Sequence, residues 1–128
     1  MIEVKNIVKQ FGEQTVLKGV STRFEAGMTN LIIGQSGSGK TVFLKSLLGI
    51  HTPDSGTISF DGRIYSELSN DEKRALRTEI GMVFQGSALF DSMTVEENIG
   101  FPLKMFTKKT PQEIKERVDF VIARVNLI

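Results

Sequence analysis

Apolar and polar residues alternate in short blocks through the first part of the chain. Residues 2–8 alternate at their start, which predicts a half-buried strand. Residues 15–17 and 20–24 predict two further short extended segments. Residues 29–33, with three apolar residues at their end, predict a buried strand. The beginning of the chain is therefore expected to be rich in strands.

The rest of the chain predicts several helices, together with one hairpin and one more buried strand. The helices are expected to be capped by Ser or Thr, or to end at Gly, Pro or basic residues. The expected helices are residues 42–48, 69–77, 94 to about Gly100 (before Pro102), and an amphipathic helix from Thr110 with Pro111 at its first position. Asp61-Gly62 predicts a tight turn between strands 57–60 and 63–65. Residues 80–84 predict a buried strand, and an irregular loop is expected after it at 86–93.

The sequence between the expected strand 29–33 and helix 42–48 is rich in glycine. It fits the phosphate-binding pattern G-x-x-x-x-G-K-[ST], in which backbone N–H groups and a helix N-terminus surround an anion. Its residues, all expected to bind nucleotide, are Gly34, Gln35, Ser36, Gly37, Ser38, Gly39, Lys40 and Thr41. We expect Lys40 to reach the β- and γ-phosphates and the Thr41 hydroxyl to coordinate Mg²⁺. A merely flexible turn would not need Lys-Thr at its end.

The amino-acid composition argues against several classes of protein and of binding site. The chain has 128 residues and a net charge of +1, and this balance argues against a dedicated nucleic-acid binder. It has no cysteine, which excludes disulfides and thiolate metal sites. No apolar run approaches the length of a membrane span, so we expect membrane contact only through partners. His51, the one histidine, is expected to be an exposed loop residue rather than a ligand.

Nucleotide hydrolysis needs more than a phosphate grip. It requires a carboxylate at the end of an apolar strand and a residue that positions water. Asp61 is the nearest candidate carboxylate, but its place before Gly62 is better explained by the hairpin turn. We therefore expect weak or absent ATPase activity from these 128 residues, and we expect them to be part of a longer protein.

The order of motifs resembles the N-terminal half of an ABC transporter ATPase, over all 128 residues. The matching features are Phe11-Gly12, the phosphate loop, P-D-x-G-x-I-x-F-D-G at 53–62, and a strand ending in Phe84-Gln85. The resemblance implies an α/β P-loop NTPase fold with an N-terminal antiparallel β subdomain, truncated before the signature and Walker B motifs. It implies a nucleotide-binding core at 1–85 and the start of a helical subdomain at 86–128.

The resemblance also implies roles for single residues. Phe11 would stack on adenine, with Val16 beside the same base; an ordinary buried Phe is the competing interpretation of Phe11. Gln85 would ligate Mg²⁺ together with Thr41 and sense the γ-phosphate, so that Lys40 and Gln85 are the catalytic candidates. The cofactors would be ATP and Mg²⁺, and the catalytic Glu and switch His would lie beyond this chain. The sequence departs from the family at Phe11, where Tyr is common, at Gln35, where Pro is common, and at Val42, where Ser or Thr is common.

Partners follow from the same resemblance. Such ATPases pair as two cassettes and drive transmembrane permease subunits from the cytoplasmic face of the bacterial cell membrane. The segment 84–95, with Ala88-Leu89-Phe90 inside it, is similar to the cassettes of Mla-type lipid-trafficking systems, which implies phospholipid or related lipid transport. Leu89, Phe90 and Met93 either dock a permease or pack inside the helical subdomain. Two alternatives stay open: an ABC-type ATPase without a membrane partner, and a nucleotide-binding module without catalysis.

Overall fold

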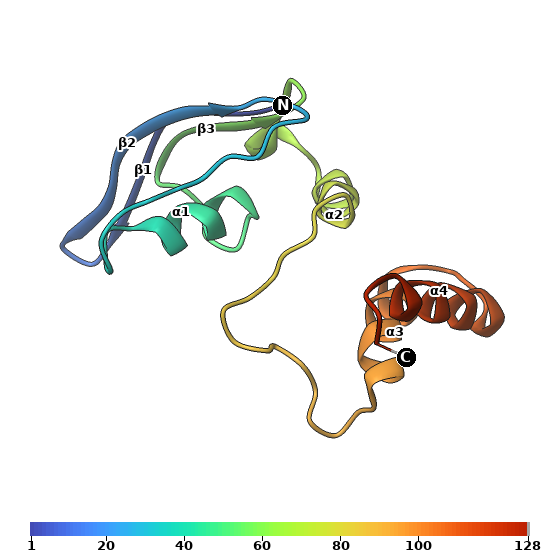
Figure 1. Ribbon diagram of the computed structural model, residues 1–128. Helices are drawn as coiled ribbons and strands as arrows, with labels where there is room; N and C mark the ends of the chain where they lie inside the picture. The colour runs from blue at the N-terminus through green and yellow to red at the C-terminus, as the bar shows by residue number, and fades with distance from the viewer. Residues whose placement is uncertain (128) are drawn as a thin grey trace. The chain divides into compact units, whose positions relative to one another are not determined.

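The computed structural model describes residues 1–127, which form two compact units, Met1–Met82 and a second from Val83 onward. The first unit is built on a four-stranded antiparallel sheet in the order β2-β1-β3-β4 (Figure 1). Its elements are β1 (Ile2–Phe11), β2 (Gln14–Phe24), α1 (Lys40–Leu47), β3 (Ser55–Phe60), β4 (Arg63–Ile64), the 3₁₀ turn η1 (Tyr65–Glu67) and α2 (Asn70–Thr78). The expected β3–β4 hairpin at Asp61-Gly62 is confirmed.

The strand β2 is continuous, whereas the sequence predicted two separate segments there. Ile7 of β1 pairs with Val20, and the next residue, Val8, pairs with Lys18, so the pairing skips Gly19. Gly19 has φ +84°, a left-handed conformation that glycine adopts without steric penalty. This extra residue is a bulge that lets the strand continue through the glycine instead of ending there.

The core of the first unit lies between the sheet and its helices. It contains seven buried apolar residues: Val4, Ile7, Leu17, Phe43, Ile58, Phe60 and Leu76. Phe43 comes from α1, and its ring centroid lies 6.3 Å from that of Phe24 on β2. Burial of an aromatic side chain of this kind stabilises by about 2–3 kcal/mol. Phe43 therefore fixes α1, and with it the phosphate loop, to the sheet.

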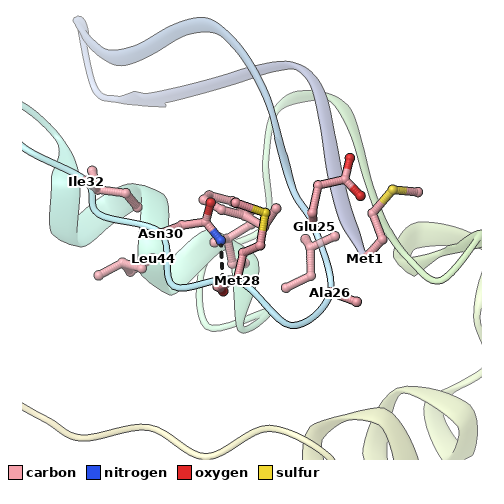
Figure 2. Close-up of a pocket in the computed structure, with 10 residues that line it drawn as sticks. Met1, Glu25, Ala26, Met28, Asn30, Ile32 and Leu44 are labelled. Atoms are coloured by element: carbon pink, nitrogen blue, oxygen red, sulfur yellow. Dashed lines mark hydrogen bonds between the residues drawn. The ribbon is translucent and has the colours of Figure 1, made fainter.

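The predictions of strands at 29–33 and 80–84 are wrong. Both segments are irregular. Several of their apolar side chains are exposed, with fractions of 84% for Leu31 and 97% for Val83, while Ile32 and Ile80 are partly buried against the core. A strand requires a neighbour that satisfies its N–H and C=O groups, and neither segment belongs to the described sheet. Along the first segment, Met28 and Ile32 line a largely apolar hollow together with Leu44 of α1 (Figure 2).

The second unit contains α3 (Val95–Phe106) and α4 (Pro111–Arg124). Each begins at a capping box, with Thr94 and Thr110 accepting the N–H groups of Glu97 and Glu113, as the sequence predicted. None of the helices within residues 1–127 is long and apolar enough to cross a membrane.

The predicted end of α3 near Gly100 is wrong, because the helix continues through Pro102 to Phe106. A proline inside a helix removes one hydrogen bond and costs about 3 kcal/mol. Packing against α4 opposes that cost. Gly100 is buried, and a Cβ placed on it would lie 3.3 Å from the Ile114 side chain and 3.5 Å from that of Val118. The two helices therefore approach closely at Gly100, and this contact holds the chain helical around the proline.

Candidate functional site

The phosphate loop runs from Gly34 to the first turn of α1. The Ser38 N–H donates to the Gln35 carbonyl oxygen at 3.1 Å, which closes a tight turn inside the loop. The helix α1 begins at Lys40, directly after Gly39 and two residues before the predicted range of 42–48. Loop and helix therefore have the order that the phosphate-binding pattern requires.

Lys40 turns its side chain back over the loop. Its Nζ donates to the carbonyl oxygens of Gly34 and Gln35, at 2.6 and 2.8 Å. The ammonium at the end of the loop is thus tied to the residues at its start, so the loop forms a ring closed by a cation. A ring of this kind places a positive charge beside the backbone N–H groups that would face a phosphate.

Gly39 is the residue on which the geometry of the loop depends. Its φ is +101°, and a Cβ placed on it would lie 3.1 Å from Val16 Cγ1 and 3.3 Å from the Val16 carbonyl oxygen. A side chain would meet both conformational strain and the neighbouring strand. Val16 therefore packs directly against the loop, at the point where α1 begins.

The N-terminus of α1 is available to an anion. Its N-cap is Gly39, and in the described part of the chain no side chain caps this end. The first N–H groups of a helix have no partner within the helix and attract negative charge. Thr41 is exposed in this first turn. One hydroxyl oxygen beside phosphate oxygens and water fits Mg²⁺, which keeps several waters when it binds. The residues present thus fit a Mg²⁺-nucleotide, whose phosphates Lys40 and Thr41 would face.

Phe11 ends β1, next to the β1–β2 turn, and is 43% exposed. Its ring contacts two side chains that sequence reasoning did not assign to the site. The His51 ring lies edge-on, with centroids 5.3 Å apart, and Lys9 Nζ lies 5.2 Å from the Phe11 centroid. Its half-exposed ring is compatible with stacking on a base. The alternation of β1 could have pointed to Lys9, two residues before Phe11, but no local signal links His51 to this ring.

Gln85 and the loop after it belong to the second unit, so a place for Gln85 beside Thr41 stays a prediction. The loop itself is held by Asn98 of α3, which sequence reasoning also missed. Asn98 Oδ1 accepts the Phe90 N–H at 2.8 Å, and Nδ2 donates to the carbonyl oxygens of Phe90, Met93 and Thr94. Leu89 and Phe90 nevertheless remain exposed, while the Phe90 ring packs on Phe101 with centroids 4.7 Å apart.

Among residues 1–127 there is no cluster of three or more His, Cys, Asp or Glu side chains that could hold a metal ion. Asp61, the candidate carboxylate from the sequence, lies in the β3–β4 turn and forms an ion pair with the N-terminal ammonium of Met1. The structure thus agrees with the interpretation of Asp61 as a turn residue. Within the first unit, metal binding would rest on Thr41 and on the nucleotide itself.

Known proteins are similar to this chain in both sequence and fold. The ABC transporter family matches residues 17–128. A probable ribonucleotide transport ATP-binding protein mkl of Mycobacterium leprae is 41% identical over 127 residues, 99% of this chain and 36% of the relative. A spermidine/putrescine import ATP-binding protein PotA of Nitrosospira multiformis is 44% identical, over 99% of this chain and 33% of that protein. Protein trigalactosyldiacylglycerol 3, chloroplastic, of Arabidopsis thaliana is 41% identical, over 99% of this chain and 36% of its own length.

Among solved structures, the dimeric ATP-binding cassette MJ0796 bound to ADP and Pi aligns with a TM-score of 0.78 and 30% identity. The alignment covers 92% of this chain and 54% of that cassette. The chain spans about a third of the length of the curated relatives it matches. The α/β P-loop fold expected from the sequence is therefore confirmed. In the chain, strands β1 and β2 of the antiparallel sheet come before the phosphate loop, and β3 and β4 come after it.

Proposed function

The chain belongs to the ABC transporter family, as an ATP-binding domain, and from this we propose that it is the phosphate-binding part of a subunit that couples ATP binding and hydrolysis to transport. The observation that carries the proposal is the ring formed by Lys40 with the Gly34 and Gln35 carbonyl groups, at the N-terminus of α1. The loop amides and the ammonium of Lys40 would stabilise the charge of the transferred phosphoryl group. Thr41 and Gln85 would hold Mg²⁺, and Phe11 and Val16 would face the adenine.

The first test is nucleotide binding by the 128-residue chain. ATP with Mg²⁺ is expected to raise the melting temperature in proportion to the logarithm of its concentration, because a ligand that binds only the folded state stabilises it by mass action. AMP, which lacks the β- and γ-phosphates, serves as the matched control and is expected to give a much smaller shift. Equal shifts with ATP and AMP, or none with either, would contradict a phosphate grip at Lys40.

The partners in this proposal are transmembrane permease subunits and a second copy of the ATPase. The family match and the dimeric form of the MJ0796 cassette support both partners. Exposed Leu89 and Phe90, on a loop that Asn98 fixes by three hydrogen bonds, offer an ordered apolar surface for a permease. The subunit would then lie on the cytoplasmic face of the bacterial cell membrane and reach the bilayer through the permease.

The transported substrate in this proposal is a phospholipid or a related lipid. The support is the similarity of the segment 84–95 to Mla-type cassettes and the 41% identity to a protein named after a galactolipid. The mkl and PotA relatives, whose names specify ribonucleotide and spermidine/putrescine transport, match as well or better over the same residues. An experiment therefore has to distinguish lipid from ribonucleotide and from spermidine/putrescine as the transported substrate.

A complex of the full-length ATPase with its permease is expected to copurify with phospholipid that resists detergent exchange. Its ATPase rate is expected to change when phospholipid is supplied in nanodiscs and to be indifferent to spermidine or ribonucleosides. The measurements are mass spectrometry of the extracted lipid and turnover with each candidate substrate. Stimulation by spermidine or by a ribonucleoside, with no response to lipid, would exclude the lipid assignment.

A further inference from the structure

The ring of Phe11 is held by two side chains that no motif of the phosphate site includes. Lys9 Nζ lies 5.2 Å from the centroid of the ring, within the range of a cation–π interaction. The His51 ring meets it edge-on at 5.3 Å with an interplanar angle of 75°, which is a favoured aromatic geometry. The orientation of Phe11 is therefore constrained by a cation and by an imidazole.

Lys9 is itself fixed. Only 16% of its side chain is exposed, and its Nζ donates to the Thr52 carbonyl oxygen at 2.9 Å and lies 3.9 Å from Asp54 Oδ1. The other carboxylate oxygen of Asp54 accepts the Gln10 N–H at 2.7 Å. The turn 51–54 is thus bonded to the end of β1 through both side chain and backbone, and Lys9 has little freedom to leave the ring.

The same turn is attached to the helix that begins at the phosphate loop. The N–H groups of Ile50 and His51 both donate to the Lys45 carbonyl oxygen, at 2.9 and 3.2 Å, close to the C-terminus of α1. A continuous series of contacts therefore runs from the phosphate loop through α1 and His51 to the ring of Phe11. All of these residues belong to the first unit.

We propose that Lys9 and His51 are positioning residues for nucleotide binding, which hold the Phe11 ring in the orientation that stacks on the adenine base. This inference rests on the proposed function, because it needs ATP at the phosphate loop and its base at Phe11. A ring whose orientation is fixed before the ligand arrives binds a base more tightly, because ordering a side chain on binding reduces affinity. Lys9 and His51 provide that order without touching the phosphates.

The experiment measures the dissociation constants of ATP and of inorganic tripolyphosphate by calorimetry on the 128-residue chain. Lys9→Met keeps the length of the side chain and removes its charge, and His51→Ala removes the imidazole. Each is expected to weaken ATP binding about two- to fivefold and to leave tripolyphosphate binding unchanged. Lys9→Arg, which keeps a cation that can donate to the Thr52 carbonyl, is expected to restore ATP binding. Lys18→Met, at an exposed position of β2, is the matched control and is expected to have no effect.

A double-mutant cycle makes the test specific. In a Phe11→Ala background, Lys9→Met is expected to cause no further loss, because the ring that it positions is gone. An additional loss in that background, or equal weakening of ATP and tripolyphosphate by Lys9→Met, would overturn the positioning role. Wild-type binding that favours ATP over tripolyphosphate and does not respond to either substitution would overturn the inference and leave the proposed function standing. Binding of neither ligand by the wild type would overturn both.

Discussion

Replacing Lys40 by alanine is expected to weaken ATP binding by at least about thirtyfold, or about 2 kcal/mol. Lys40 donates to the carbonyl oxygens of Gly34 and Gln35, so its ammonium already lies at the entrance of the loop. A phosphate that enters the loop offers this ammonium charged acceptors in place of neutral carbonyls, and hydrogen bonds to charged groups are about twice as strong as those between neutral groups. The alanine variant loses that gain.

The stability of the ligand-free protein is expected to change little in this variant. The carbonyl groups of Gly34 and Gln35 belong to exposed residues, so water can replace the ammonium. The prediction is therefore checked by two measurements, the ATP dissociation constant and the melting temperature without nucleotide. Lys45→Ala, in the last turn of the same helix, removes an equal charge away from the loop and is the matched control. Similar losses of ATP affinity in both variants would show that general charge, and not the phosphate grip, determines binding.

The parts of this fold that sequence could predict depend on neighbouring residues. The start of α1 after Gly39 and the capping boxes at Thr94 and Thr110 are fixed by chemistry within a few positions of each other. The β3–β4 turn at Asp61-Gly62 is equally local. In each case the residue types that give the signal are also those that make the hydrogen bond or adopt the positive φ.

The errors arose where distant residues decide the structure. The apolar pattern of 29–33 and 80–84 is that of a strand, but a strand exists only beside a partner, and the described sheet includes neither segment. Pro102 predicted a helix end, yet the close contact of Gly100 with Ile114 and Val118 keeps α3 continuous.

The candidate site likewise contains a part that depends on neighbouring residues and a part that depends on distant ones. The phosphate loop could be recognised because its residues are consecutive, and in the structure Lys40 donates to two carbonyl groups of that same loop. The environment of Phe11 was not evident, because His51 lies forty residues along the chain from it and approaches it only in the folded unit. The sequence predicts His51 as an exposed loop residue, whereas it is half-buried. Its contact with Phe11 depends on the β1 end, the turn 51–54 and α1 together.

Gly56→Ala is expected to destabilise the first unit by about 3–5 kcal/mol, a large effect for a single methyl group. Gly56 lies near the start of β3 with φ +87°, where an L side chain is strained. A Cβ there would lie 2.3 Å from the Asn6 carbonyl oxygen and 2.5 Å from that of Lys5. Both are backbone atoms of the central strand β1, so no rotation of a side chain can relieve the overlap.

The strand β1 is also unable to move aside at this point. The Asn6 N–H donates to Ser21 Oγ at 2.9 Å, and the Ser21 hydroxyl donates to Asn6 Oδ1 at 3.2 Å, so β2 holds Asn6 from the other side. The pairing of β1 with β3 shifts register around Gly56, between the Lys5–Thr57 and Val8–Ser55 pairs. A side chain at Gly56 would therefore separate β3 from β1 and disturb the adjoining turn that carries Asp54.

Urea unfolding of the first unit checks this expectation, with Gly62→Ala as the matched control. Gly62 has a similar φ of +82° in the β3–β4 turn, but a Cβ there would meet no atom within 4 Å. The control therefore contains the conformational strain without the overlap, and a loss of about 1 kcal/mol is expected for it. The difference between the two variants measures the contact with Lys5 and Asn6 alone. Equal losses would mean that β1 and β3 adjust at Gly56 at little cost, and that the overlap with Lys5 and Asn6 does not determine the need for glycine there.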